Sequence, residues 1–350
     1  MKIAFFIGQM GCGGAERVIS LLANDYCRRG WDTDIVMLLG NDLFYRLEPG
    51  VRPVDLSGGG GSYLKRAPYW MKEIRRYLKK EKPDLVVSFI GRINALVLTA
   101  AMGLKIPIVV SERNDPRHDG RGKFMLAYCD AIYRTARAVV FQTRAEQACF
   151  SDAVKAKGTI IPNPVSVEGA ARREPEGFHV VTAGRLAPQK NQKMLIDAME
   201  IVCREIPEAK CTIYGEGELR QELERRIRET GLEGTVFLPG HTLKIHEKIA
   251  GASVFVLTSE FEGLSNALIE AMMLGIPCVT TDYPGAEEVT ENGVTGLIVP
   301  RGDAGALAEK LIFLARDQET GNTLGKNARQ EAERYRAGNV IAQWRKVIEG

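Results

Sequence analysis

The sequence lacks long hydrophobic runs, paired cysteines and a recognisable export signal. No eighteen consecutive apolar residues occur in its 350 residues, so no segment is expected to span a membrane. The seven cysteines are scattered without a Cys-x-x-Cys pair, which argues against zinc and disulfides and favours a reducing cytosol. The first apolar run, residues 3–7, is short and lacks a small-residue cleavage site, so we expect a β-strand there and no signal peptide.

Signatures of other ligand classes are also missing. The first glycine-rich loop contains Gly11 and Gly13, but the dinucleotide fingerprint requires glycine or alanine where this chain has Glu16. Asp32-Thr33-Asp34 resembles a metal-binding acidic pair, but it lies at the start of a strand, far from any nucleotide-binding turn. We therefore interpret the two aspartates as polar residues at a strand entry and expect no metal there. No basic motif is interleaved with aromatic residues, so no nucleic-acid partner is expected.

Apolar strands alternate with helical patterns along the whole chain. Such alternation is typical of α/β proteins with parallel sheets, and 350 residues exceed the comfortable size of one core. We therefore expect two Rossmann-like, doubly wound domains, residues 1–165 and 176–335, joined by a polar linker. A last helix, residues 336–350, is expected to return to the first domain with Trp344 as its packing anchor.

The most informative stretch follows an apolar strand at residues 254–257 and ends at Glu270. Gly263 would let the backbone approach a ligand, and a helix from about Ser265, capped by Ser265 or Asn266, could point its first N–H groups at an anion. Glu262 and Glu270 could lie up to about 12 Å apart along that turn and helix. The paired carboxylates of glycoside hydrolases lie only about 5–9.5 Å apart. The larger separation favours a site in which Glu262 and Glu270 bind two ends of one long ligand. An ordinary strand–turn–helix connection remains the alternative.

Cations follow an earlier strand of the same half. Arg185 and Lys190 flank a turn that opens a helix at about Asn191. A guanidinium offers a bidentate fork to phosphate and an ammonium adds a point charge. Two cations, a helix start and two carboxylates together favour a nucleoside diphosphate that carries a sugar.

These residues resemble the donor site of the retaining family-four glycosyltransferases, which have the GT-B fold with a cleft between two domains. The resemblance covers nearly the whole chain in the expected order. It rests on Gly13-Gly14-Ala15-Glu16-Arg17, Gly184-Arg185-Leu186, Lys190-Asn191, Glu262 and Glu270 with seven residues between them, Pro284-Gly285-Ala286-Glu287-Glu288-Val289, Gly293 and Gly296-Leu297.

The resemblance implies a role for each matching residue. Arg185 and Lys190 would stabilise the departing diphosphate without a metal or other cofactor, Glu262 would bind donor-sugar hydroxyls, and Glu270 would bind the ribose. Donor-site backbone is expected at Gly13, Gly14, Gly263, Leu264, Ser265 and Gly240, with His241 as a candidate neighbour of the base. A tight turn at Gly13–Gly14 and a merely solvated His241 are the alternatives.

Polar clusters also follow two strands of the first half. Arg92 and Asn94 follow one strand, and Arg113 and His118 follow the next, at the sheet edge where such folds bind ligands. Relatives have a histidine where this chain has Arg113. An arginine cannot act as a base, so we expect it to bind a donor phosphate or an acidic or diphosphate group of the acceptor.

Charge is unevenly distributed. Residues 1–165 contain 25 Lys or Arg and 16 Asp or Glu, a net charge of +9, and the rest contains 22 and 28, a net charge of −6. Residues 64–82 read as a basic amphipathic helix. Its apolar stripe could simply pack on the sheet. Alternatively, the helix lies on an anionic membrane with Tyr69 and Trp70 near the interface.

The expected function is transfer of a hexose or N-acetylhexosamine from a nucleoside-diphosphate sugar, with uridine favoured as the base, to a hydroxyl of a glycan or polyprenyl-diphosphate-linked glycan. A cytoplasmic protein, peripheral on the inner face of the cytoplasmic membrane, would suit that acceptor. The alternative functions are those of a GT-B-fold nucleotide-sugar epimerase and of a non-catalytic sugar-binding protein. The glycine stretch at residues 57–62 is expected to be flexible; it resembles an engineered linker, and a natural mobile loop is the alternative.

Overall fold

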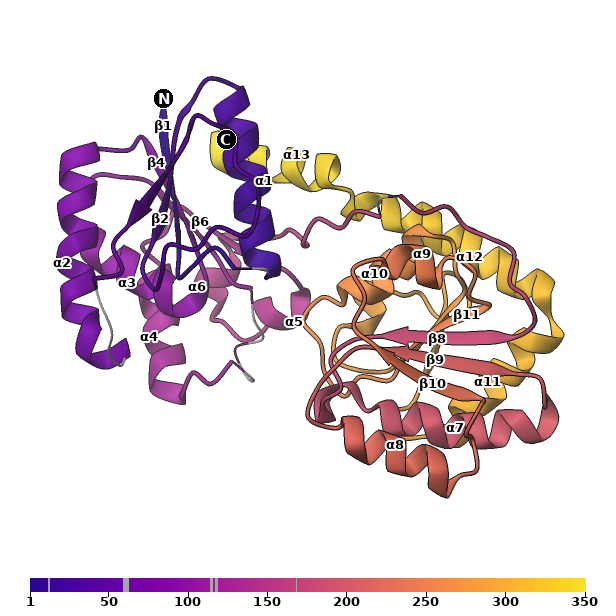
Figure 1. Cartoon of the computed structure of the whole chain (residues 1–350). Helices are drawn as coiled ribbons and strands as arrows, with labels where there is room; N and C mark the ends of the chain where they lie inside the picture. Colours follow the sequence, from indigo (N-terminus) through magenta and orange to yellow (C-terminus); the bar gives the residue numbers. More distant parts are fainter. Residues whose placement is uncertain (12, 59–62, 114–115, 117–118, 168) are drawn as a thin grey trace. The chain divides into compact units, whose positions relative to one another are not determined.

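The computed structural model describes the whole chain except Cys12, residues 59–62, 114–115 and 117–118, and Glu168. Two compact units make up the chain, residues 1–164 with 337–350 and residues 165–336 (Figure 1). The expected linker therefore groups with the second unit. One reason is Arg172, whose guanidinium donates to the carbonyl oxygens of Ala250 and Ala252 at 3.0 and 2.6 Å.

The described part of the first unit contains a seven-stranded parallel sheet in the order β3-β2-β1-β4-β5-β6-β7. Alternate residues of β1 face opposite sides, as strand geometry requires, so Ala4 and Phe6 join one core while Ile3 and Phe5 join the other. The strands are β1 Lys2–Ile7, β2 Asp32–Met37, β3 Val51–Asp55, β4 Leu85–Phe89, β5 Ile108–Ser111, β6 Ala138–Phe141 and β7 Gly158–Ile160.

Helices cover both faces of this sheet. Helices α2, α3 and α4 contribute to one core, and α1 and α13 to the other. Trp344 on α13 has no exposed surface and its ring stacks on Phe89 at 5.4 Å, which confirms it as a packing anchor. The helices are α1 Gly14–Arg28, α2 Tyr63–Glu81, α3 Gly91–Ala101, α4 Lys123–Tyr133, α5 Arg144–Gln147, α6 Asp152–Lys155 and α13 Ala337–Glu349.

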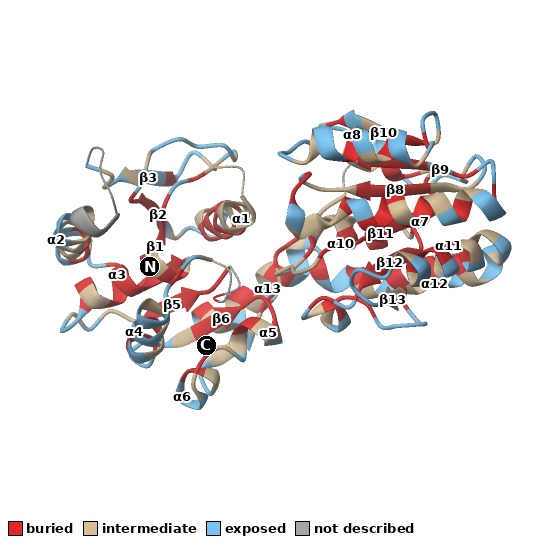
Figure 2. Cartoon of the chain, turned by 90° about the horizontal axis from the view of Figure 1, so that it is seen from below, coloured by how far each residue is buried: buried red, intermediate tan, exposed pale blue. Residues whose placement is uncertain are grey.

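The second unit contains a six-stranded parallel sheet in the order β10-β9-β8-β11-β12-β13, and Figure 2 shows its central strands β8, β11 and β12 as mostly buried. Two parallel-sheet α/β units confirm the expected fold class. The strands are β8 His179–Ala183, β9 Lys210–Tyr214, β10 Val236–Gly240, β11 Val254–Leu257, β12 Cys278–Thr281 and β13 Leu297–Val299. The helices are α7 Gln192–Glu205, α8 Arg220–Glu229, α9 Ile245–Ile249, α10 Asn266–Met273, α11 Ala304–Arg316 and α12 Gln318–Ala332, with short 3₁₀ turns at Pro188–Lys190, Ala286–Glu288 and Glu333–Tyr335.

Asp34 differs from the expectation of a polar strand entry, because it lies inside β2 with no exposed surface. Its carboxylate accepts from Arg52 Nε at 2.8 Å and Nη2 at 2.6 Å and from the Tyr77 hydroxyl, and Lys2 Nζ lies 3.4 Å away. Burial alone would raise the pKa of Asp34, but these hydrogen bonds and charges lower it. The acidic residue therefore ties β1, β2, β3 and α2 together.

The apolar stripe of α2 packs on the sheet. Trp70, Ile74 and Leu78 have no exposed surface, and the Arg66 guanidinium lies over the Trp70 ring at 4.4 Å. The expectation that Trp70 reaches a membrane interface is therefore wrong, whereas Tyr69 is 42% exposed. A membrane contact of α2 would rest on its outward-facing cations.

Candidate active site

The strand order of the second sheet reverses between β8 and β11. Doubly wound sheets bind their ligands in the crevice outside the carboxyl ends of the strands at such a reversal, and the loops that leave β8 and β11 lie at that end. The loops are residues 184–191 and 258–265. Both segments were singled out from the sequence, and the fold brings them together.

Hydrogen bonds hold the two loops against each other. The Thr258 hydroxyl donates to the carbonyl oxygen of Lys190 at 2.8 Å. The backbone N–H of Glu260 donates to the carbonyl oxygen of Gln189, and the Gln189 amide donates to that of Phe261, both at 2.8 Å. The backbone on either side of the crevice is therefore fixed by three contacts.

Asn191 sets the direction of the first loop. Its backbone is left-handed, with φ 42°, a conformation that asparagine tolerates better than most residues. Its side chain accepts from the Met194 N–H at 3.3 Å, which caps α7, and donates to Glu260 Oε1 at 2.6 Å. One side chain thus fixes the start of α7 and the second loop.

Lys190 and Glu262 form an ion pair across the crevice. Ser259 Oγ also donates to Glu262 Oε1 at 2.6 Å, and the Glu262 side chain is only 7% exposed. Arg185 is exposed, and its guanidinium pairs with no carboxylate among the described residues. The site therefore offers one free cation and one that is already held by a carboxylate.

The start of α10 lies beside this pair. Ser265 occupies the N-cap position, but its side chain makes no capping hydrogen bond, contrary to expectation. Ser265 Oγ and Asn266 Oδ1 are both buried and without a hydrogen-bond partner in the described structure. Because the first N–H groups of a helix also lack helical partners, this position offers several unsatisfied polar groups to an anion.

Glu270 lies one turn further along α10 and faces His246 of α9. His246 Nε2 and Glu270 Oε2 are 3.3 Å apart, and both side chains are mostly covered. His246 was not expected from the sequence, because nothing in the spacing of residues 246 and 270 indicates a contact. His241, the histidine singled out instead, is exposed in the loop after β10.

Glycines let the ends of β8, β9 and β10 approach closely. Gly215 has φ 148°, and a Cβ there would lie 1.9 Å from the carbonyl oxygen of Gly184. Gly240 has φ 90°, and its carbonyl oxygen accepts from the Gly215 N–H at 3.0 Å. Side chains larger than hydrogen are thereby excluded from this part of the crevice wall.

The first sheet reverses between β1 and β4. Gly13 and Gly14 lie at the start of α1 after β1, and the Tyr45 hydroxyl donates to the Gly13 carbonyl oxygen at 3.1 Å. Ile90, after β4, has φ 75°, which is strained for a β-branched residue. Such strain concentrates at functional sites, so this edge of the first unit is its candidate ligand edge.

Asn94 differs from its expected role. It is fully buried, and its amide donates to the Ser111 carbonyl oxygen at 2.9 Å and the Tyr133 hydroxyl at 3.0 Å. Asn94 thus supports the ends of the strands from inside the first unit. Arg92 is partly exposed and donates to the carbonyl oxygen of Gly120 at 2.8 Å.

A buried ion pair that was not expected from the sequence lies next to Asn94. Arg121 donates to both oxygens of Glu112, at 2.9 and 2.7 Å, and the Tyr133 hydroxyl donates to the same carboxylate. Burial and the Glu112 charge raise the pKa of Tyr133 well above its usual value, so it stays protonated as a donor. Cβ atoms are excluded at Gly91, where one would lie 1.7 Å from Arg121 Nη1.

Arg113 is withdrawn into the first unit and is only 6% exposed. Its guanidinium lies 5.2 Å from the ring centroids of both Phe89 and Trp344 and donates to Asn163 Oδ1 at 2.9 Å. Burial lowers the pKa of this group to about 9, against the opposing charge of Glu146. Arg113 therefore makes its contacts inside the first unit, and its binding to a donor phosphate or to an acidic or diphosphate group of the acceptor stays a prediction. His118 lies outside the described residues.

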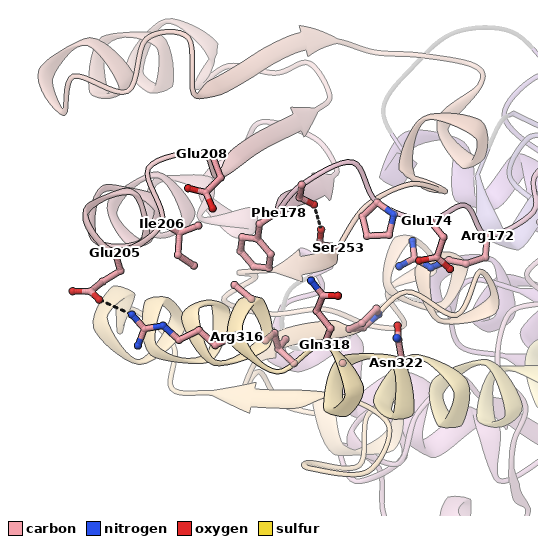
Figure 3. A pocket seen from close by; sticks show the side chains of 16 residues that line it. Arg172, Glu174, Phe178, Glu205, Ile206, Glu208, Ser253, Arg316, Gln318 and Asn322 are labelled. Atoms are coloured by element: carbon pink, nitrogen blue, oxygen red, sulfur yellow. Dashed lines mark hydrogen bonds and ion pairs between the residues drawn. The ribbon is translucent and has the colours of Figure 1, made fainter.

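A separate hollow of 440 Å³ lies at the opposite edge of the second sheet (Figure 3). Its apolar lining includes Phe178, Ile206 and Leu314, and Glu205 and Arg316 pair at 2.7 Å. Ser253, at the amino end of β11, donates to the Gly177 carbonyl oxygen at 3.0 Å. None of the predicted site residues lines this hollow.

Within the described residues, no three His, Cys, Asp or Glu side chains are grouped so that they could hold a metal ion. The helices of that same part of the chain include none with the length and apolar character needed to cross a membrane.

Two protein-family models match almost the whole chain. "Glycosyltransferase Family 4" matches residues 12–168 and "Glycosyl transferases group 1" matches residues 169–331. Over 99% of this chain and 98% of the relative, the chain is 28% identical to the GalNAc-α-(1→4)-GalNAc-α-(1→3)-diNAcBac-PP-undecaprenol α-1,4-N-acetyl-D-galactosaminyltransferase of Campylobacter jejuni. It is 34% identical to the poly(glycerol-phosphate) α-glucosyltransferase of Bacillus subtilis over 48% of this chain and 25% of that one.

Solved structures share the fold along the whole chain. The Anabaena protein HepE in complex with UDP superimposes with a TM-score of 0.83 at 21% identity and covers 100% of both chains. Sucrose-phosphate synthase from Thermosynechococcus elongatus superimposes with a TM-score of 0.81 at 20% identity, over 99% of this chain and 98% of that one.

Proposed function

Because the chain belongs to the family-4 glycosyltransferases and has their GT-B fold, we propose that it moves a hexosyl or N-acetylhexosaminyl group from a UDP-linked donor to a hydroxyl of a glycan or lipid-linked glycan. The observation that carries this proposal is the crevice between β8 and β11. It combines a free Arg185, the Lys190–Glu262 pair, the unsatisfied start of α10 and Glu270 within one unit.

The donor would lie along this crevice with its ribose at Glu270 and its diphosphate at the start of α10. Arg185 and Lys190 would stabilise the negative charge that develops on the departing diphosphate, without a metal. A preorganised group of this kind contributes about 3–4 kcal/mol to lowering the barrier. Glu262 would then bind hydroxyls of the donor sugar, since Ser259 and Lys190 already hold its carboxylate.

Retention of the donor's anomeric configuration is part of the proposal. The bond between the anomeric carbon and the phosphate oxygen breaks, and a bond from that carbon to the acceptor oxygen forms on the same face. The acceptor's proton passes to the leaving phosphate oxygen. Because the new bond forms on the face from which the phosphate departs and the phosphate oxygen takes the proton, the proposed route uses no protein nucleophile. Glu262 acts in it only as a hydrogen-bond acceptor for donor-sugar hydroxyls.

Two observations support a lipid-linked acceptor. The Campylobacter jejuni relative, by its name, acts on an undecaprenyl-diphosphate-linked glycan, and the chain matches it over 99% of its length. The first half of the chain carries a net charge of +9, which suits a diphosphate group or an anionic membrane surface. We place the protein in the cytoplasm, peripheral on the inner face of the cytoplasmic membrane.

Release of nucleoside diphosphate tests the proposal. Purified protein is incubated with UDP-hexoses and UDP-N-acetylhexosamines, with and without a bacterial lipid extract, and UDP is measured. We expect UDP release that depends on the extract. A new nucleotide-sugar epimer without UDP release would indicate an epimerase, and binding without either product would indicate a sugar-binding protein.

A further inference from the structure

Glu270 has one close polar neighbour in the described structure, His246. The two come from different helices, α9 and α10, and their nearest atoms, Nε2 and Oε2, are 3.3 Å apart. The side chains are 22% and 18% exposed, so the contact is largely shielded from water. No other cationic side chain of the described residues lies within 4 Å of this carboxylate.

The charged neighbours of His246 on α9 point elsewhere. Lys244 lies 3.7 Å from Glu247 on the exposed side of the helix, and Arg173 donates to the Glu247 carbonyl oxygen at 2.7 Å. Lys248 is exposed. Among the charged and polar side chains described on α9 and at its N-cap, His246 is therefore the one that contacts Glu270.

The chemistry of the contact indicates which ring nitrogen of His246 carries a hydrogen. A nitrogen lone pair and a carboxylate oxygen repel each other at this separation, so Nε2 carries the hydrogen. Nε2 is buried, and it has no aligned hydrogen-bond partner in the described structure. A buried N–H without an acceptor costs free energy, and a reorientation of Glu270 that completes this bond recovers that cost.

We propose that His246 is a positioning residue for the nucleotide ribose. Its Nε2–H donates to Glu270 Oε2 when the nucleotide binds, which orients the carboxylate so that both ribose hydroxyls can donate to it. The inference rests on the proposed function, because it requires Glu270 to be the ribose contact. It adds a residue on which selection of ribose over deoxyribose depends.

Comparison of UDP with 2′-deoxy-UDP isolates this role. Dissociation constants for both are measured by calorimetry on the wild type, His246→Leu, His246→Gln and Glu270→Ala. The quantity of interest is the preference for UDP over 2′-deoxy-UDP. His246→Leu should lower this preference roughly fivefold, the equivalent of one hydrogen bond of about 1 kcal/mol. His246→Gln should restore most of it, because its amide N–H can replace Nε2–H.

A matched control is Lys248→Leu, which removes an exposed cation from the same helix without touching Glu270 and should leave the preference unchanged. Equal loss of affinity for both nucleotides in His246→Leu would mean that the histidine only packs, and would overturn the inference. An unchanged preference in Glu270→Ala, or a wild type without any preference, would instead contradict the ribose contact of the proposed function. Thermal unfolding of each variant identifies losses that come from misfolding.

Discussion

Lys190 and Arg185 are both cations of the β8 loop, but their surroundings differ. Lys190 is paired with Glu262, whereas Arg185 is exposed and holds no carboxylate of the described residues. Arg185 can therefore bind an incoming diphosphate directly. Lys190 must either leave the Glu262 carboxylate or contact the carboxylate and the diphosphate at the same time. A charge that is already fixed in position needs little reorganisation as the leaving group develops its own charge.

Lys190→Ala and Arg185→Ala should each lower kcat by about 10²–10³, the usual effect of removing one preorganised charge from a leaving group. Lys190→Ala should in addition remove the ion pair that helps to position the Glu262 carboxylate. Steady-state kinetics with a UDP-sugar measures both effects, and Lys193→Ala, an exposed lysine of α7, is the control. Near-normal turnover in either site variant would place the diphosphate elsewhere.

Activity should persist in the presence of a chelator, because Arg185, Lys190 and the start of α10 supply the positive charge that a metal would otherwise provide. The measurement is UDP release after treatment with excess EDTA, with heat-denatured protein as the blank. Loss of activity that magnesium or manganese restores would contradict the metal-free proposal.

Elements with a strong local signal could be predicted from the sequence. The strand predicted at residues 254–257 is β11 Val254–Leu257, and the first predicted strand is β1 Lys2–Ile7, because both are buried apolar runs beside a turn. The edge strand β3 has no such run. Its Arg52, Pro53 and Asp55 are exposed, and proline is tolerated there because an edge strand has an unpaired side.

Contacts between elements could not be predicted in the same way. The Glu112–Arg121 pair lies within the loop between β5 and α4, and the His246–Glu270 pair joins α9 to α10. Nothing in the local sequence pattern of these residues indicates which partner each one contacts. Asn94 and Arg113 were expected at the ligand edge because they follow strands. Whether such a side chain turns outward depends on the partners that packing offers it, here Tyr133 for Asn94 and Asn163 for Arg113.

The Asp34 cluster makes the packing of α2 on the sheet sensitive to acid. Hydrogen bonds from Lys2 and Arg52 lower the pKa of Glu81 on α2 to about 2, and the pKa of Asp34 is lowered as well. A carboxyl whose pKa is lower in the folded protein stabilises it fully above the unfolded pKa, and this contribution is lost as the pH falls through the folded pKa. The affected window for Glu81 runs from about pH 4.5 down to about 2.

Glu81→Gln should therefore reduce the loss of the free energy of unfolding that the wild type shows between pH 5 and pH 3. Urea unfolding at both pH values measures it. Glu73→Gln, which breaks only the pair with the exposed Arg76 on the same helix, is the control. Equal pH dependence in the wild type and Glu81→Gln would show that the cluster does not set acid stability.

The charge of the whole molecule is divided between its halves, +9 for residues 1–165 and −6 for the rest. Such an asymmetry leaves the average charge small while giving the first half an attraction to anionic surfaces. With Trp70 in the core, Tyr69 is an aromatic of α2 that stays exposed, and a membrane contact would rest mainly on exposed cations such as Lys79 and Lys80.

We therefore expect reversible, salt-sensitive binding to anionic membranes. A basic residue near such a surface contributes about 1 kcal/mol, and the attraction fades over about 8 Å at physiological salt. The wild type should sediment with phosphatidylglycerol-containing vesicles at low salt and be released at high salt. Lys79→Glu combined with Lys80→Glu should abolish sedimentation, whereas Lys326→Glu with Arg329→Glu, an equal change on α12 of the acidic half, should not. If the wild type ignores anionic vesicles at low salt, the cations of α2 serve solubility alone, and a lipid-linked acceptor must be recognised through its diphosphate and glycan without help from the surrounding membrane.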